Sequence, residues 1–344
     1  MTDPVLQVVP LGAQWPTIDP FLFCAHHDDA FPAGNADLGP DAPLTGRQLG
    51  SDFSGRDGWS MYHGQVVPGF PRHPHRGFET ITYVRSGLID HSDSLGAAAR
   101  FGEGDVQWMT AGKGIVHAEM FPLLNSSGAN PAELFQIWLN LPAADKMVEP
   151  HFSMLWSHDL PSVRVFDDAG AATEIVVIAG ALQGAVPPAS PPASYASRPE
   201  AELEIWHLRL EPGARFVLPP ATEGVVRTLY VFEGGDLAVG SHQLGVDSGA
   251  VLRIDEPVAL TNGNEITECL VLGGRPIGEP VAQYGPFVLN DEAGIRQAFA
   301  DYERTEFGGW PWPSDAPVHG DASRGRFARH NDGRLEELTP QPVD

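Results

Sequence analysis

Two pairs of residues in the N-terminal half of the chain carry side chains that can bind a metal ion. His73 and His75 are separated by one proline, and His117 and Glu119 repeat this spacing across an alanine. In a β-strand, residues i and i+2 point to the same face, so each pair can direct two donor atoms towards one ion. Three imidazole nitrogens and one carboxylate oxygen leave one or two positions of an octahedral ion open. Open positions can take water, dioxygen or a substrate, which indicates reactivity or sensing.

One His-x-His pair alone has a simpler explanation. Histidines spaced in this way on a strand are often surface or packing residues. The second pair, with the same spacing and a carboxylate, favours a metal site over that explanation.

Short β-strands are the elements expected to position these side chains. Runs rich in β-branched and aromatic residues recur between turn residues, and the chain contains 38 Gly and 32 Pro. This pattern predicts an all-β fold of the barrel or sandwich type. The expected strands cover residues 80–84, 88–91, 106–109 and 134–139, then 175–178, 204–210, 228–232, 250–254 and 268–272.

The two halves of the chain share motifs at similar positions. Pro68-Gly69 and Tyr83-x-x-x-Gly87 correspond to Pro212-Gly213 and Tyr230-x-x-x-Gly234, which indicates an internal duplication. One short helix is predicted near the C-terminus, about residues 291–303, with Asn290 as its N-cap.

These patterns divide the chain into four parts. Residues 1–60 are expected to be an N-terminal extension that packs on the first barrel, and residues 61–142 to be that barrel. Residues 143–310 are expected to be a linker and the second barrel with its helix. Residues 311–344 are expected to be a polar tail, because they are rich in proline and their apolar residues show no helical or strand periodicity.

Composition restricts the possible partners and the cellular location. The 344 residues include 21 basic and 45 acidic side chains, and the formal charge of −24 disfavours direct binding to nucleic acid or to an anionic membrane. No apolar run approaches the roughly 20 residues of a membrane span, and no targeting segment is visible. The two cysteines, Cys24 and Cys269, form no disulfide or zinc pattern. We therefore expect a cytoplasmic protein.

Two long segments around the candidate ligands resemble the signature segments of the pirins. The first is His73-Pro-His-Arg-Gly-Phe-Glu-Thr80, and the second runs from Gly104 to Met120 and contains Gly112-Lys-Gly-Ile-Val-His-Ala-Glu119. The resemblance covers roughly residues 60–305. It includes Gln136–Pro142, Asp145–Pro150, Leu272–Gly274 and Gln283–Asn290. The segment 28–58 and the chain beyond Gly308 depart from the family, and both are placed where they can cover the mouth of a pocket.

Resemblance to the pirins implies a bicupin, in which two cupin (jelly-roll) β-barrels lie in one chain. It also implies that His73, His75, His117 and Glu119 bind one transition-metal ion, usually Fe(II). Manganese, nickel, copper and zinc accept the same donors. In the wider cupin superfamily the carboxylate ligand follows the second histidine by four residues, which here is Glu79. We favour Glu119 as the ligand and assign Glu79 a supporting position.

The resemblance leaves more than one function open. Some pirins open the ring of flavonols such as quercetin with dioxygen. In a quercetin 2,3-dioxygenase-type oxidoreductase, Glu119 would be both ligand and catalytic proton acceptor, with a small aromatic substrate. Other pirins act as iron-dependent, redox-sensing regulators that bind a protein partner. A third alternative is another metal-dependent cupin enzyme acting on a different small molecule.

The second barrel is expected to contain no metal. The offsets that lead from Gly104 to His117 and Glu119 lead from Gly249 to Asn262 and Asn264, and neither is an anionic ligand. We expect this barrel to stabilise the chain. We also expect residues 283–290 and the helix to reach back and clamp the first barrel.

Overall fold

The computed structural model describes residues 3–320 and 323–338. Strands dominate, and the described residues contain a single α-helix, α1 (Glu292–Thr305). This confirms the prediction of an all-β fold with a short C-terminal helix. Short 3-10 turns cover η1 (Arg56–Gly58), η2 (Tyr195–Ser197), η3 (Pro199–Ala201) and η4 (Glu306–Gly308).

The chain forms two compact units that are not continuous in sequence. The first unit comprises His26–Gln136, Leu141–Ser157 and the chain from Glu279 on. The second comprises the chain up to Ala25, Ile137–Asn140 and His158–Gly278. The two predicted barrels, residues 61–142 and 143–310, are continuous ranges, whereas each observed unit is assembled from separate segments of the chain.

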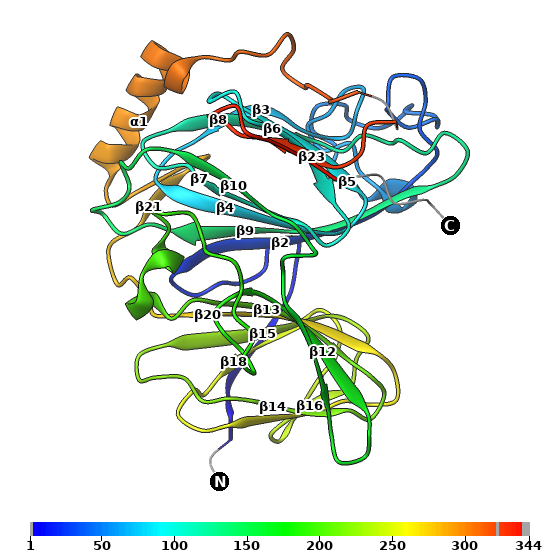
Figure 1. The fold of residues 1–344 in the computed structure, drawn as a ribbon, viewed down its shortest axis with the longest axis vertical. Coiled ribbons are helices and arrows are strands. Elements are labelled where there is room, and N and C mark those ends of the chain that lie inside the picture. Colours follow the sequence, from blue (N-terminus) through cyan, green and yellow to red (C-terminus); the bar gives the residue numbers. More distant parts are fainter. Residues whose placement is uncertain (1–2, 321–322, 339–344) are drawn as a thin grey trace. The chain divides into compact units, whose positions relative to one another are not determined.

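Two sheets build the first unit (Figure 1). The six-stranded sheet has the order β24-β23-β6-β5-β8-β3, and the five-stranded sheet has the order β10-β7-β4-β9-β2. Buried aromatic and aliphatic side chains, among them Phe31, Phe101 and Leu134, form its core. The strands of the first sheet are β3 (Gly69–His75), β5 (Leu88–Asp93), β6 (Ala98–Gly102), β8 (Ile115–Met120), β23 (Phe327–Arg329) and β24 (Leu335–Glu337). Those of the second are β2 (Phe21–Phe31), β4 (Phe78–Ser86), β7 (Val106–Thr110), β9 (Asn130–Asn140) and β10 (His151–Leu155). The start of β2, up to Ala25, and the end of β9, from Ile137, belong to the second unit.

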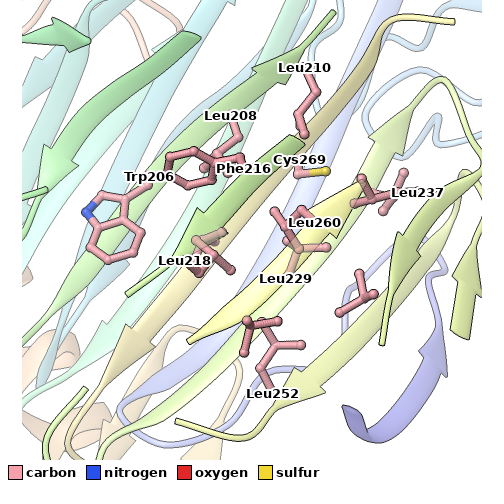
Figure 2. Close-up of a cluster of buried hydrophobic side chains, with 14 of the residues drawn as sticks. Trp206, Leu208, Leu210, Phe216, Leu218, Leu229, Leu237, Leu252, Leu260 and Cys269 are labelled. Carbon is pink, nitrogen blue, oxygen red and sulfur yellow. The ribbon is translucent and has the colours of Figure 1, made fainter. Parts of the chain in front are cut away.

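A seven-stranded sheet and a four-stranded sheet build the second unit. Alternation along β13 places Trp206, Leu208 and Leu210 in an apolar core with Cys269 (Figure 2). Burial raises the pKa of the Cys269 thiol, so this side chain behaves as a small apolar group. The first sheet contains, in order, β1 (Val5–Pro10), β18 (Ser248–Leu252), β15 (Val226–Glu233), β20 (Thr267–Gly274), β13 (Glu204–Leu210), β12 (Ala172–Ala179) and β11 (Ser162–Phe166). The second contains β14 (Arg215–Leu218), β19 (Val258–Thr261), β16 (Leu237–Val239) and β17 (His242–Leu244).

The N-terminal segment is divided between the units. Strand β1 pairs antiparallel with β18, so residues 5–10 add an edge strand to the second unit. Trp15 stacks on Tyr230 of the same unit at 5.1 Å between ring centroids. The extension was expected to pack on the first barrel as a whole, whereas only the part from His26 on belongs to that unit.

Helix α1 and its cap each begin one residue later than predicted. The Asp291 carboxylate, not Asn290, accepts a hydrogen bond from the Gly294 amide at 2.7 Å. The buried face of the helix, Ile295 and Ala298, packs on Phe287 of the hairpin formed by β21 (Ala282–Tyr284) and β22 (Phe287–Leu289).

The C-terminal segment contains regular structure where a polar tail was predicted. Strand β23 pairs with β6 and with β24, and Phe327 and Ala328 are buried. Local composition hides these strands because each is three residues long and depends on a partner far away in sequence. Residues 321–322 and 339–344 of the predicted tail lie outside the described residues.

Candidate metal centre

The two predicted pairs meet across the β3–β8 ladder. His73 lies opposite His117, and Phe70 lies opposite Glu119. The ring centroids of His73 and His117 are 4.4 Å apart, and that of His75 lies 4.7 Å from His73 and 4.9 Å from His117. One nitrogen from each of the three rings lies within 4.8 Å of the others. The structure thus brings together three of the four predicted donors at a spacing that suits one ion.

Hydrogen bonds orient two of the three imidazoles. Nδ1 of His73 lies 2.9 Å from the carbonyl of Pro71, and Nδ1 of His75 lies 3.4 Å from the carbonyl of Pro286. A carbonyl oxygen can only accept, so Nδ1 carries the proton in both rings. Nε2 of each ring is then left as the nitrogen able to bind a metal.

His117 is the most deeply buried of the three. Its side chain has no exposed surface, and neither ring nitrogen has a hydrogen-bond partner among the described residues. A buried polar atom without a partner is costly, and a metal ion would remove that cost.

Burial keeps the three imidazoles neutral at pH 7. It lowers the pKa of His73 from 6.5 to about 4. Burial, together with the neighbouring imidazoles, holds the pKa of His75 and of His117 well below 6.5. Neutral imidazole is the form that binds metal, so the site does not have to lose protons before it can bind an ion.

Glu119 lies beside this cluster but is held by other side chains. Its Oε2 is 3.9 Å from Nε2 of His117. Its Oε1 accepts a hydrogen bond from the Thr82 hydroxyl at 2.9 Å, and the Gln136 amide lies 3.4 Å from Oε2. Burial raises the pKa of Glu119. Coordination of a metal by Glu119 stays a prediction.

Glu79, the alternative carboxylate, is fully buried on β4. It accepts hydrogen bonds from the Thr110 hydroxyl at 2.8 Å and from the Trp108 indole at 3.2 Å, both on the neighbouring strand β7. These donors tie β4 to β7. Phe78, the residue before Glu79, packs its ring 5.0 Å from His75.

A further pair of polar residues that was not among the predicted ligands lies near the centre. His91 and Asp93 of β5 are fully buried, and Nε2 of His91 lies 3.3 Å from Oδ2 of Asp93. His91 lies opposite Glu119 in the β5–β8 ladder, and its ring is 5.6 Å from that of His117. The sequence contains a signal for this pair, because His91 and Asp93 have the same two-residue spacing as the predicted metal-binding pairs.

The segment before α1 reaches the residues beside the ligands. The Val288 amide donates to the Arg76 carbonyl at 3.0 Å, and the Arg76 guanidinium lies 2.9 Å from the Asp301 carboxylate in α1. Residues 286–288 and the helix therefore contact the strand end that carries His75, and the clamp of the first barrel stays a prediction.

In the second unit, Asn262, which the sequence offset matched to His117, supports a turn after β19. The Asn262 side-chain amide donates to the carbonyls of Leu210, Glu211 and Glu265 at 2.7–3.1 Å. Asn264 is exposed. No helix within the described residues is both long and apolar enough to cross a membrane.

Comparison with known proteins agrees with this architecture. Residues 5–139 match the family model Pirin, and residues 205–308 match the Pirin C-terminal cupin domain. The chain is 33% identical to human Pirin over 246 residues, which are 70% of this chain and 78% of that protein. It is 38% identical over 239 residues to a Pseudomonas aeruginosa protein provisionally named quercetin 2,3-dioxygenase, covering 70% of this chain and 79% of that one.

A solved structure has a similar fold. The crystal structure of quercetin 2,3-dioxygenase from Acinetobacter baumannii superimposes with a TM-score of 0.70 at 27% sequence identity, covering 90% of this chain and 99% of that one. The two units are cupin domains, and the histidine cluster in the first brings together donors suited to a single metal ion. The chain belongs to the pirin family, the bicupins of the cupin superfamily.

Proposed function

We propose that this pirin is a metal-dependent dioxygenase that opens the ring of a flavonol or a related aromatic hydroxyketone, with Fe(II) as its metal. The observation that carries the proposal is the cluster of three neutral imidazoles within 4.8 Å, one of them buried without a partner. The relatives named for quercetin 2,3-dioxygenase activity support the choice of substrate class.

The donor set fits a reactive metal rather than a closed structural one. Three histidines and one carboxylate leave open positions, as oxygen-activating iron sites require. When bound, the metal supplies Lewis acidity and a means of bringing dioxygen, the oxidant, to the substrate; both oxygen atoms enter the products.

Glu119 is proposed to handle the substrate proton. Burial raises the pKa of Glu119, which makes its carboxylate a better proton acceptor near neutral pH. The Thr82 hydroxyl donates to Oε1, and Oε2, which faces His117 and lies 3.4 Å from the Gln136 amide, is the oxygen proposed to take the proton of the substrate hydroxyl. The substrate hydroxyl must lose this proton before its own oxygen can bind a metal tightly.

The location is proposed to be the cytoplasm. Both cysteines are free and buried, and Cys24 and Cys269 are therefore suited to a reducing compartment. The excess of acidic residues argues against direct contact with nucleic acid.

Turnover of quercetin with and without metal tests the proposal. We expect the purified chain to consume quercetin only when dioxygen is present, to lose activity on chelation and to regain it with Fe(II). His117→Ala should abolish turnover, while His158→Ala, which removes an exposed histidine of the second unit, should leave it unchanged. Metal-replete protein that is inert towards several flavonols would overturn the enzyme proposal and favour the iron-dependent regulator that binds a protein partner.

A further inference from the structure

We propose that Phe53, His63 and Phe70, here called the aryl subsite, bind the pendant aromatic ring of a hydroxyketone whose chelating end sits at the metal centre. The subsite would make the protein selective for substrates with an aryl group over small chelators. This inference rests on the proposed function because it specifies the substrate of the same site.

A β-bulge turns Phe70 towards the metal centre. Phe70 pairs with Glu119 and His73 pairs with His117, so three residue steps on β3 match two steps on β8. His117 and Glu119 share one face of β8 because they are two residues apart. The extra residue on β3 therefore places Phe70 on the face that carries His73, instead of the opposite face that regular alternation would give.

Aromatic rings continue from the metal centre to the surface. The Phe70 ring lies 6.5 Å from that of His73, 5.7 Å from that of His63 and 6.4 Å from that of Phe53. The rings of Phe53 and His63 are 5.1 Å apart. Exposure rises towards the outer end of this path: His73 and Phe70 are half-buried, whereas His63 is exposed and Phe53 is 56% exposed.

The exposed Phe53 ring stands on a fixed loop. Its neighbour Asp52 is buried and accepts hydrogen bonds from Arg47 at 2.9 Å and from the Met61 amide at 3.1 Å. Asp52 and Tyr62 also exchange two backbone hydrogen bonds of 2.8 Å. A large apolar ring held in place at the surface is pre-organised to bind, because it loses little freedom when a ligand covers it.

The residue beneath the subsite is strained. Tyr62 has a left-handed backbone, with φ of 55°, and stacks on Phe70 at 5.2 Å. Its hydroxyl donates to the buried Asp29 carboxylate at 2.6 Å. Such conformations are costly for residues with a side chain and gather at functional sites.

The chemistry of the path selects a neutral, planar ligand. The three rings offer faces and edges for stacking, and the Phe53 and Phe70 side chains carry no charge. The chelating end must carry vicinal oxygens to reach the metal. A flavonol combines both features, whereas the hydroxypyranone maltol has the same chelating group without an aryl ring.

Binding of these two compounds to zinc-loaded protein under argon tests the inference without turnover. We expect 3-hydroxyflavone to bind more tightly than maltol. Phe53→Ala should weaken the binding of 3-hydroxyflavone about 5-fold and leave that of maltol unchanged. Phe53→Tyr should retain wild-type affinity, whereas Phe53→Leu should not, because stacking needs a ring. Phe166→Ala, which removes an equally exposed phenylalanine of the second unit, is the matched control.

The outcomes separate this inference from the proposed function. Equal affinity for both compounds, or equal loss of both in Phe53→Ala, would overturn the aryl subsite. Flavonol turnover with an unchanged KM in Phe53→Ala would also overturn it while leaving the dioxygenase proposal intact. Conversely, ring-dependent binding without any turnover by the Fe(II)-loaded chain would support the subsite and reject the dioxygenase. Phe70→Ala gives an independent test if its unfolding temperature matches the wild type.

Discussion

His117 lies directly opposite His73 across the β3–β8 ladder, with their ring centroids 4.4 Å apart. Because the two strands are hydrogen-bonded neighbours, the positions of the two imidazoles are set by the backbone ladder. A metal bound between them would connect β3 to β8. Metal binding is therefore expected to stabilise this sheet as well as to supply reactivity.

The two candidate carboxylates should differ in their effect on metal affinity. Glu119→Gln is expected to weaken Fe(II) binding by tenfold or more, as loss of a ligand or of a close partner does. Glu79→Gln should weaken it less, because Glu79 is held by Thr110 and Trp108. Competition with a chromophoric chelator measures both affinities. The reverse order would assign the carboxylate ligand to Glu79.

Metal binding should resist acid better than an ordinary histidine site does. The pKa of His73 is lowered to about 4, and those of His75 and His117 also lie well below 6.5. Since protons compete for the three imidazoles only near and below these pKa values, metal affinity in the Glu119→Gln variant, which lacks the carboxylate whose pKa is raised, should be nearly flat from pH 8 to pH 6 and fall steeply below pH 5. Equilibrium dialysis at fixed free metal gives this profile. A steep fall between pH 7 and pH 6 in this variant would contradict the lowered pKa values of the histidines.

The ion pair between α1 and Arg76 should stabilise the first unit above pH 4. Hydrogen bonds from Arg76 lower the pKa of Asp301 from 3.8 to about 2. This stabilisation is present above the unfolded pKa and is lost as the pH falls through the folded one. Asp301→Asn is expected to lower the free energy of unfolding by roughly 1 kcal/mol at pH 7, with the difference shrinking towards pH 2. Urea unfolding measures this loss of free energy, and Glu303→Gln on the same helix is the control. Equal effects of the two variants would reject a specific role for the ion pair.

The C-terminal strands should contribute to stability. Phe327 of β23 is 2% exposed, whereas Leu335 of β24 is 51% exposed. Phe327→Ala is expected to reduce the free energy of unfolding by about 3 kcal/mol or more, and Leu335→Ala by less than about 0.5 kcal/mol. Thermal unfolding of both variants compares the loss of stability at a buried and at an exposed position of the same C-terminal segment. A Phe327→Ala protein as stable as the wild type would mean that β23 is dispensable.

Asn262 should matter for stability and not for metal content. Its amide donates to three carbonyls, which would be left without this donor in Asn262→Ala. We expect a loss of about 2 kcal/mol in the free energy of unfolding and an unchanged ratio of one metal ion per chain. Elemental analysis and chemical unfolding of the same preparation provide both readouts. Loss of metal from a folded preparation of this variant would mean that the ion is bound in the second unit.

Several features of this protein could be predicted from the sequence because they depend on neighbours along the chain. The two-residue spacing of His73 with His75 places both rings on one face of a strand wherever that strand lies. The helix could be predicted for the same reason, since its apolar period and capping residues lie within one segment. The all-β character followed from the local alternation and turn residues.

Other features were decided only by tertiary structure. The position of His91 opposite Glu119, the bulge that turns Phe70 towards His73 and the pairing of β23 with β6 all depend on which strands become neighbours and in which register. A change of register by one residue reverses the face of every side chain on a strand, and no local pattern fixes that choice. The division of the chain into two interleaved units has the same origin. Pairing of residues 5–10 with 248–252 is selected by burial and hydrogen bonding between segments more than two hundred residues apart, and it becomes visible only in the folded protein.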